Sequence, residues 1–237
     1  MSGLSAEEIA ERRGEVLARI ARACGRVGRG PSEVSLLAVT KSHPAETVRR
    51  AAMSGMTLFG ENRVAEGVRK IEALRSEFPG LRWRLIGPLQ TNKAKPALQY
   101  FSVIESLDRE RLAARLEGLL ASEERVFPVL LEVNLGGEAT KSGAEPGRVE
   151  ALVEKALACR HLDVRGLMAV PPLSAEPEDA RPYFRQLREI RDRLAARFGR
   201  QFPELSMGMT HDFEVAVEEG ATQVRVGTAL FGSRGQG

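Results

Sequence analysis

Lys41 is the first residue of the chain whose position suggests covalent chemistry. It follows Thr40 and the apolar run Leu36-Leu-Ala-Val39, which has the composition of a buried strand. An amine at the end of such a strand is partly desolvated and can be neutral enough to form a Schiff base with an aldehyde. A solvated lysine that simply ends a strand would have the same sequence, so position alone leaves both interpretations open.

Two later segments combine small and hydroxyl-bearing residues, as phosphate sites do. One is Ser206-Met-Gly-Met-Thr210, which precedes a predicted helix, and the other is Gly227-Thr228, which begins a turn. Glycines let the backbone approach an anion, and hydroxyls and helix-start N–H groups bind it. Ordinary turns are the alternative, but small residues in both segments favour phosphate, with Ser206, Gly227 and Thr228 as the candidates.

Arg225 stands alone within the apolar segment Val224-Arg225-Val226. If it points inward it needs a polar partner, and it then lies near the predicted phosphate site. If it points outward, a salt bridge between the sheet and a helix would account for a charged residue in an apolar strand. A Schiff-base lysine, a phosphate site and an arginine beside a pyridine nitrogen are the components of a pyridoxal 5′-phosphate (PLP) site. Together the three features indicate PLP as cofactor.

Short apolar runs alternate with amphipathic helical stretches along the rest of the chain. The runs are typical of strands buried on both faces of a parallel sheet, and they cover residues 35–40, 57–60, 82–86, 101–106, 127–134, 163–168, 204–207 and 223–226. The predicted helices between them cover residues 45–54, 62–78, 91–99, 109–122, 146–159, 178–198 and 211–219.

This alternation predicts an α/β fold, because parallel strands need a crossover connection. Eight units in 237 residues predict a single closed (β/α)₈ TIM barrel. An extra N-terminal helix, Ser5 to Val27, precedes it and begins with a capping box of Ser5 and Glu8. An open doubly wound sheet is the alternative, weakened because no GxGxxG follows the first strand. We expect one domain over residues 1–237.

The composition of the chain argues against a nucleic-acid-binding protein, a membrane protein and a metal site. The chain has 35 basic and 32 acidic residues, for a net charge of +3, and the two signs are interspersed. A nucleic-acid-binding accessory protein would concentrate its basic residues in a patch. Uncharged stretches run to about ten residues, whereas a membrane span needs roughly eighteen, and no apolar signal segment begins the chain. We therefore expect a cytoplasmic protein. The two cysteines and three histidines lack metal-ligand spacing.

Seven segments together resemble the PLP homeostasis protein family, the single-domain relatives of the alanine racemase N-terminal barrel. They extend nearly end to end and fall at the predicted strand ends. They are Ala38-Val-Thr-Lys41, Phe59-Gly-Glu-Asn62, Ile86-Gly-Pro-Leu-Gln-Thr-Asn-Lys93, Val133-Asn134 with Lys141-Ser-Gly143, Gly166-Leu-Met-Ala169, Leu205-Ser-Met-Gly-Met209 with Asp212, and Val224-Arg-Val-Gly-Thr228 with Phe231-Gly232.

The resemblance implies a PLP-binding barrel without established turnover. It implies that Lys41 holds PLP as a Schiff base and that Asn62 lines the ring pocket. It also implies that Arg225 faces the pyridine nitrogen and that Ser206, Gly227 and Thr228 bind the phosphate. Two positions depart from the family pattern. Arg84 follows Trp83 where the family usually has His, so the role of that His is not transferred, and Arg63 stands where the family often has Tyr.

Two functions remain open, a PLP carrier and a PLP-dependent amino-acid racemase. Racemisation by two bases needs an acid–base group on each face of the substrate, and the resemblance implies that two-domain racemases take the second from a tyrosine of the other domain. The chain ends at Gly237, soon after the eighth strand, so we expect no second domain. Neither Tyr100 nor Tyr183 follows a predicted strand.

We therefore expect a monomeric carrier that delivers PLP, with apo PLP-dependent enzymes as the partners. An arginine beside the pyridine nitrogen disfavours protonation of that nitrogen and weakens the ring as an electron sink. Lys141, in the glycine-rich loop after the fifth strand, offers a transient second amine near the barrel mouth; a solvated loop lysine is the alternative.

Overall fold

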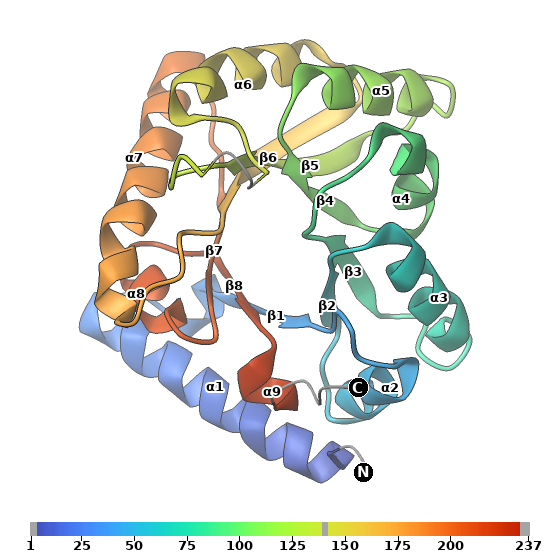
Figure 1. Cartoon of the computed structure of the whole chain (residues 1–237), viewed down its shortest axis with the longest axis vertical. Helices are drawn as coiled ribbons and strands as arrows, with labels where there is room; N and C mark the ends of the chain where they lie inside the picture. Colours follow the sequence, from blue (N-terminus) through green and yellow to red (C-terminus); the bar gives the residue numbers. More distant parts are fainter. Residues whose placement is uncertain (1–3, 139–141, 233–237) are drawn as a thin grey trace.

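Eight parallel strands form a closed barrel in sequence order, and β1 pairs with β8 to complete it (Figure 1). The computed structural model describes residues 4–138 and 142–232. The strands are β1 (Ser35–Val39), β2 (Leu58–Glu61), β3 (Arg82–Leu85), β4 (Val103–Leu107), β5 (Phe127–Val133), β6 (Leu162–Ala169), β7 (Glu204–Met209) and β8 (Gln223–Val226). The closed ring confirms the predicted TIM barrel, and the open-sheet alternative is wrong.

A ring of helices surrounds the barrel (Figure 1). They are α1 (Ala6–Arg26), α2 (Ala45–Met53), α3 (Val64–Leu74), α4 (Ala94–Tyr100), α5 (Glu110–Ala121), α6 (Val149–Ala158), α7 (Arg181–Phe198), α8 (Phe213–Glu218) and α9 (Thr228–Phe231). Each predicted helix is present, usually shorter by one to four residues at an end. The largest difference is at the end of α3, which the sequence predicts to residue 78 and which ends at Leu74. In addition, β7 continues to Met209 and α8 begins only at Phe213.

Helix α1 is part of the ring of helices and does not lie outside it. The helix after β8, α9, has only four residues and covers little of the sheet. Helix α1 packs against α8, α9 and α2 and fills this part of the ring (Figure 1). Its buried face includes Ile9, Val16 and Ile20. The predicted capping box begins it, because the Ser5 hydroxyl accepts a hydrogen bond from Glu8 N at 3.2 Å while Ser5 N donates to the Glu8 carboxylate.

The side-chain alternation of the strands separates two environments. Most buried apolar residues fill the layer between barrel and helices. Inside the barrel there are two small apolar clusters, one around Leu37 of β1 and one around Leu130 of β5. Glu105, Ser206 and Arg225 are also buried there. The barrel interior is therefore unusually polar, and its buried charges need partners in place.

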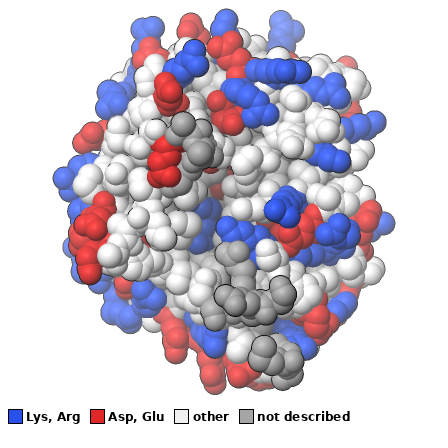
Figure 2. Space-filling view, viewed as in Figure 1, with Lys and Arg blue, Asp and Glu red and all other residues white. Residues whose placement is uncertain are grey.

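The face of the molecule that surrounds the barrel mouth has no dominant charge. On the face shown in Figure 2, Lys and Arg alternate with Asp and Glu around the rim of the barrel. Within residues 4–138 and 142–232, none of the helices is long and apolar enough to span a membrane.

Candidate functional site

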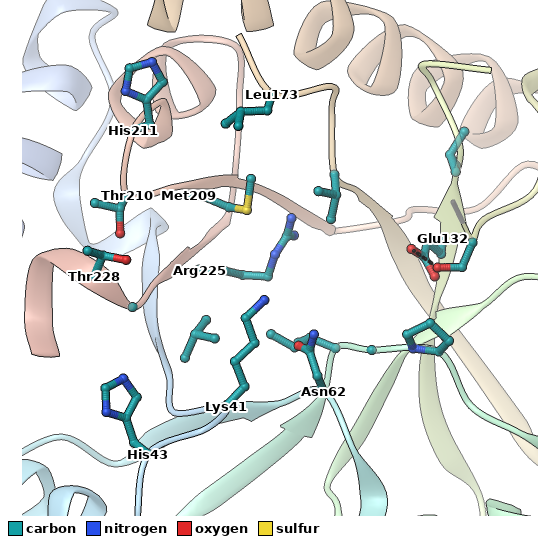
Figure 3. Close-up of a pocket in the computed structure, with 18 of the residues that line it drawn as sticks. Lys41, His43, Asn62, Glu132, Leu173, Met209, Thr210, His211, Arg225 and Thr228 are labelled. Atoms are coloured by element: carbon teal, nitrogen blue, oxygen red, sulfur yellow. Dashed lines mark hydrogen bonds between the residues drawn. The ribbon is translucent and has the colours of Figure 1, made fainter. Parts of the chain in front are cut away.

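A pocket of about 780 Å³ lies at the carboxyl end of the barrel strands, where barrels of this kind hold their ligands. Five of the six predicted site residues line it, namely Lys41, Asn62, Arg225, Gly227 and Thr228 (Figure 3). They come from the ends of β1, β2 and β8, far apart in sequence and brought together by closure of the ring. Lys141 lies outside the described residues.

Lys41 projects from the end of β1 into this pocket, toward Arg225, with the Asn62 amide beside it (Figure 3). The direction follows from the period of two along the strand, because Leu37 and Val39 face the barrel interior. Lys41 is therefore a partly buried residue of the pocket wall and does not point along the outer surface. A primary amine enclosed by the mouth of a barrel is suited to condensation with an aldehyde.

A pair of hydroxyl groups lies on the side of the pocket near α9. Thr210 follows β7 and Thr228 begins α9, and their hydroxyls face one another (Figure 3). The Ala229 N–H is 3.4 Å from Thr210 Oγ1. Gly208, the penultimate residue of β7, has a φ of +90°. A Cβ there would be 2.5 Å from that of Ala216, so only glycine allows this bend. Two hydroxyls and adjacent backbone donors can hold a phosphate.

The prediction for Ser206 needs correction. Ser206 is fully buried below the pocket and does not line it. Its hydroxyl donates to Glu105 at 2.6 Å and accepts hydrogen bonds from Gln223 at 3.0 Å and Arg225 at 2.8 Å. These contacts occupy its hydrogen-bonding capacity. The hydroxyl of this segment that reaches the pocket is that of Thr210, four residues further along.

Arg225 points into the barrel and not into a helix–sheet salt bridge. It is 4% exposed. One guanidinium nitrogen donates to Ser206 O at 2.6 Å and to Ser206 Oγ, and the other donates to Ala169 O at 2.7 Å. Burial lowers the pKa of the guanidinium, and the carboxylates of Glu105, Glu132 and Asp212 oppose this effect. Arginine nevertheless remains a cation and a hydrogen-bond donor in proteins. The three bonds fix its orientation at the pocket floor.

Arg84, the residue that departs from the family pattern, does not line the pocket. It reaches into the lower barrel, where it donates to Glu105 at 3.1 Å and to Glu204 at 2.7 Å. Glu105 also accepts hydrogen bonds from Ser206 and Gln223. A continuous set of polar contacts thus connects Arg84 through Glu105 and Ser206 to Arg225.

Glu132 of β5 is a pocket residue that the sequence analysis missed. It faces the pocket from the side opposite Thr210 (Figure 3). Ser142 Oγ donates to one of its carboxylate oxygens at 3.1 Å, and the other has no partner within the described part of the chain. Burial raises the pKa of Glu132 to about 7; Asp108 also raises it, while Ser142 and Arg225 oppose the shift. A lone carboxylate within the apolar segment Leu131-Glu132-Val133 is the signal that could have identified it.

The raised pKa of Glu132 predicts a pH dependence of stability. The folded chain binds this proton more tightly than the unfolded chain does, so the proton's contribution to folding is complete below the unfolded value near 4.5. That contribution is lost as the pH rises through about 7. A shift of this size corresponds to about 3 kcal/mol. We expect Glu132→Gln to remove this loss.

Urea unfolding at about pH 5 and about pH 8 measures the effect. The difference in unfolding free energy between the Glu132→Gln variant and the unsubstituted chain should grow by up to about 3 kcal/mol in favour of the variant at the higher pH. Glu110→Gln, at an exposed position, is the control and should show no such growth. If the difference in unfolding free energy between Glu132→Gln and the unsubstituted chain does not change with pH, the pKa of Glu132 is not raised.

The barrel and the strand-end site place the chain in a known class. A family described as "Alanine racemase, N-terminal domain" matches residues 16–235. An alanine racemase of Clostridium difficile has the same fold, with a TM-score of 0.69 at 13% identity, over 93% of this chain and 56% of that longer one. At this identity the similarity concerns the fold alone.

Two nearer relatives define the family more closely. The "Pyridoxal phosphate homeostasis protein" of Aquifex aeolicus is 48% identical over 224 residues, 94% of this chain and 97% of that protein. A structure of PipY of Synechococcus elongatus with PLP bound superposes with a TM-score of 0.83 at 37% identity, over 94% of this chain and 100% of that one. The chain belongs to the family of pyridoxal phosphate homeostasis proteins, which confirms the resemblance seen in the sequence.

Proposed function

We propose that this chain binds PLP in the pocket at the barrel mouth and holds it as a Schiff base on Lys41. The direction of the Lys41 side chain into that pocket, opposite a pair of hydroxyls, is the observation on which the proposal rests. A relative at 37% identity has PLP bound, and the pocket is large enough for it. Bound PLP supplies an aldehyde that condenses with a primary amine, with loss of water.

The phosphate of PLP is assigned to the Thr210 and Thr228 hydroxyls and to the backbone at Gly227. Thr210 replaces Ser206 of the sequence prediction because Ser206 is committed to the barrel interior. At Gly227 a Cβ would be 3.2 Å from Val39 O, so the glycine keeps the backbone close to β1. Asn62 beside Lys41 lines the position of the ring.

Substitution of Thr228 tests the phosphate assignment. Thr228→Val keeps the shape of the side chain and removes one hydrogen bond to a charged group, which costs about 1.5–3 kcal/mol. We expect the dissociation constants of PLP and of pyridoxine 5′-phosphate, which lacks the aldehyde, both to rise about 10- to 100-fold. Titration calorimetry measures both. Thr57→Val, at an exposed position before β2, is the control, and unchanged affinity in Thr228→Val would disprove the assignment.

Arg225 is assigned to the pyridine nitrogen of PLP. A guanidinium donates hydrogen bonds and accepts none, so the nitrogen opposite it is unprotonated. An unprotonated ring withdraws electrons weakly and supports carbanion chemistry poorly. This favours binding and release of PLP over turnover of amino acids.

The absence of a suitably placed tyrosine also favours a carrier over a racemase. Tyr100, at the end of α4, donates to Glu72 on the outer side of the helix ring. Tyr183 lies in α7, and neither of these two tyrosines lines the pocket. We therefore propose that the chain buffers PLP and delivers it to apo-enzymes without efficient turnover.

Spectroscopy of the purified chain tests this function. Addition of PLP should produce the visible absorbance band of a Schiff base, and borohydride should abolish the band and increase the protein mass by one reduced PLP. A chain that shows neither change would contradict PLP binding on a lysine. Incubation with both enantiomers of each amino acid then tests the carrier function, because turnover at about 1 s⁻¹ or faster would indicate an enzyme.

A further inference from the structure

An ionic cluster lies directly behind Lys41, between the barrel and α3. It consists of Glu61 from β2 and Glu66 and Lys70 from α3, whose side chains are 0%, 19% and 6% exposed. None of the three lines the pocket. The Lys70 ammonium is 2.7 Å from Glu61 Oε1 and 2.7 Å from Glu66 Oε1. A buried cation with two carboxylates requires a reason, because burial of charges is costly.

The cluster binds the backbone on both sides of Lys41. On the preceding side, Lys70 Nζ donates to Thr40 O at 2.7 Å, and the Thr40 hydroxyl donates to Glu61 at 2.6 Å. On the following side, Ser42 N donates to Glu66 Oε1 at 2.6 Å. Lys41 faces the pocket while its two neighbours are held from behind by the helix.

The backbone at Ser42 needs such support. Its φ is +65°, and among the described non-glycine residues only Glu124 shares this left-handed conformation. A non-glycine residue there is strained and persists only where the surroundings hold it. The backbone bond from His43 N to Thr40 O, at 3.0 Å, closes the turn around Ser42. The bond from Ser42 N to Glu66 is the side-chain support for this conformation.

The charge states of the cluster favour strong hydrogen bonds to the backbone around Lys41. Burial opposes ionisation of Glu66, but the hydrogen bonds from Lys70 and Ser42 N outweigh it and lower the pKa of Glu66. Burial raises the pKa of Glu61, an effect that Lys70 and Thr40 oppose. Glu66 is therefore an ionised acceptor at neutral pH, and charge-assisted hydrogen bonds of this kind are stronger than neutral ones.

We propose that Glu66 and Lys70 are positioning residues that set the direction of the Lys41 amine by fixing the backbone at Thr40 and Ser42. The inference rests on the proposed function, since it assigns the cluster to the covalent step at Lys41. Attack on an aldehyde requires the amine at close range and in one orientation, and a displacement of about 1 Å reduces such rates on the order of 100-fold. Binding of the phosphate at Thr210 and Thr228 does not depend on this orientation.

Two ligands separate positioning from a merely structural role. PLP reports the covalent step through the rate of appearance of the Schiff-base absorbance, and pyridoxine 5′-phosphate reports non-covalent binding in the same pocket. In Glu66→Ala and Lys70→Met we expect the rate with PLP to fall about 10- to 100-fold. The affinity for pyridoxine 5′-phosphate should stay within about threefold, because no contact of the phosphate is removed.

Further variants complete the comparison. Glu72→Ala, which removes a different carboxylate of α3 that accepts a hydrogen bond from Tyr100, is the matched control and should change neither quantity. Glu66→Gln keeps an oxygen for Ser42 N and should restore most of the rate. Because Glu66 is partly exposed, its variants provide the test even if Lys70→Met does not fold.

The outcomes distinguish this inference from the proposed function. An unchanged rate in Glu66→Ala, or equal losses of covalent rate and of pyridoxine 5′-phosphate affinity, would overturn the positioning role while leaving PLP binding intact. If the unsubstituted chain forms no Schiff base, the proposed function itself fails. A selective loss of the covalent rate, with rescue by Glu66→Gln, supports the inference.

Discussion

Substitution of Lys41 by alanine is expected to abolish covalent retention of PLP completely. The side chain of Lys41 is the amine that enters the pocket from β1 (Figure 3), and alanine has no group that condenses with an aldehyde. The Schiff-base absorbance should disappear, and borohydride should add no mass to the variant. Mass spectrometry of the intact protein and of its peptides measures both results.

Two comparisons make the Lys41 experiment specific. Lys41→Arg keeps the positive charge but cannot form the Schiff base, so it should match Lys41→Ala in covalent retention. Pyridoxine 5′-phosphate should still bind both variants within about tenfold of its original affinity, because its phosphate contacts remain. Reduced PLP found on Lys93 or Lys141 in the unsubstituted chain, and not on Lys41, would refute the assignment.

Glu105→Ala is expected to destabilise the fold by about 3–5 kcal/mol, the usual cost of removing one member of a buried ionic group. Glu105 is fully buried. Its carboxylate accepts hydrogen bonds from Arg84, Ser206 and Gln223 at 3.1, 2.6 and 2.7 Å. Alanine would leave Arg84 with Glu204 alone and would remove a carboxylate that stabilises the charge of Arg225.

Urea unfolding measures this effect. Glu150→Ala, which breaks an exposed pair with Arg197, is the control and should cost no more than about 1 kcal/mol. Glu105→Gln keeps two polar atoms in the same volume. Its loss of unfolding free energy should therefore lie between those of Glu105→Ala and Glu150→Ala. A loss below about 1 kcal/mol for Glu105→Ala would show that Arg84 and Arg225 do not depend on this carboxylate.

The sequence was sufficient for the architecture because the signals involved are local. Short apolar runs and amphipathic stretches alternate regularly, and the strand ends follow from the same pattern. Lys41, Asn62, Arg225, Gly227 and Thr228 stand at those ends, and the carboxyl ends of parallel strands necessarily meet at one end of a barrel. This is why five of the six site residues line one pocket.

Tertiary structure alone decided which hydroxyl after β7 reaches the pocket. Ser206 and Thr210 lie in one segment of similar composition. The register between β7 and β8 shifts between Ser206 and Met209, and Gly208 bends the chain there. These two features turn Ser206 inward and bring Thr210 to the pocket, and neither is visible in local propensity.

The partners of the charged side chains within the fold were also decided by tertiary structure and not by sequence pattern. Arg84 and Glu105 are 21 residues apart, and Lys70 is 30 residues from the carbonyl of Thr40 that it contacts. In the sequence they resemble the solvated charges of ordinary helices and strands. The pattern of residues determined the barrel and the location of its site, because periodicity depends on near neighbours. The distant partners of the buried charges, such as Glu105 for Arg84 and Thr40 O for Lys70, were decided only by the tertiary fold. The reason is that electrostatic interactions depend on distance in space and not along the chain.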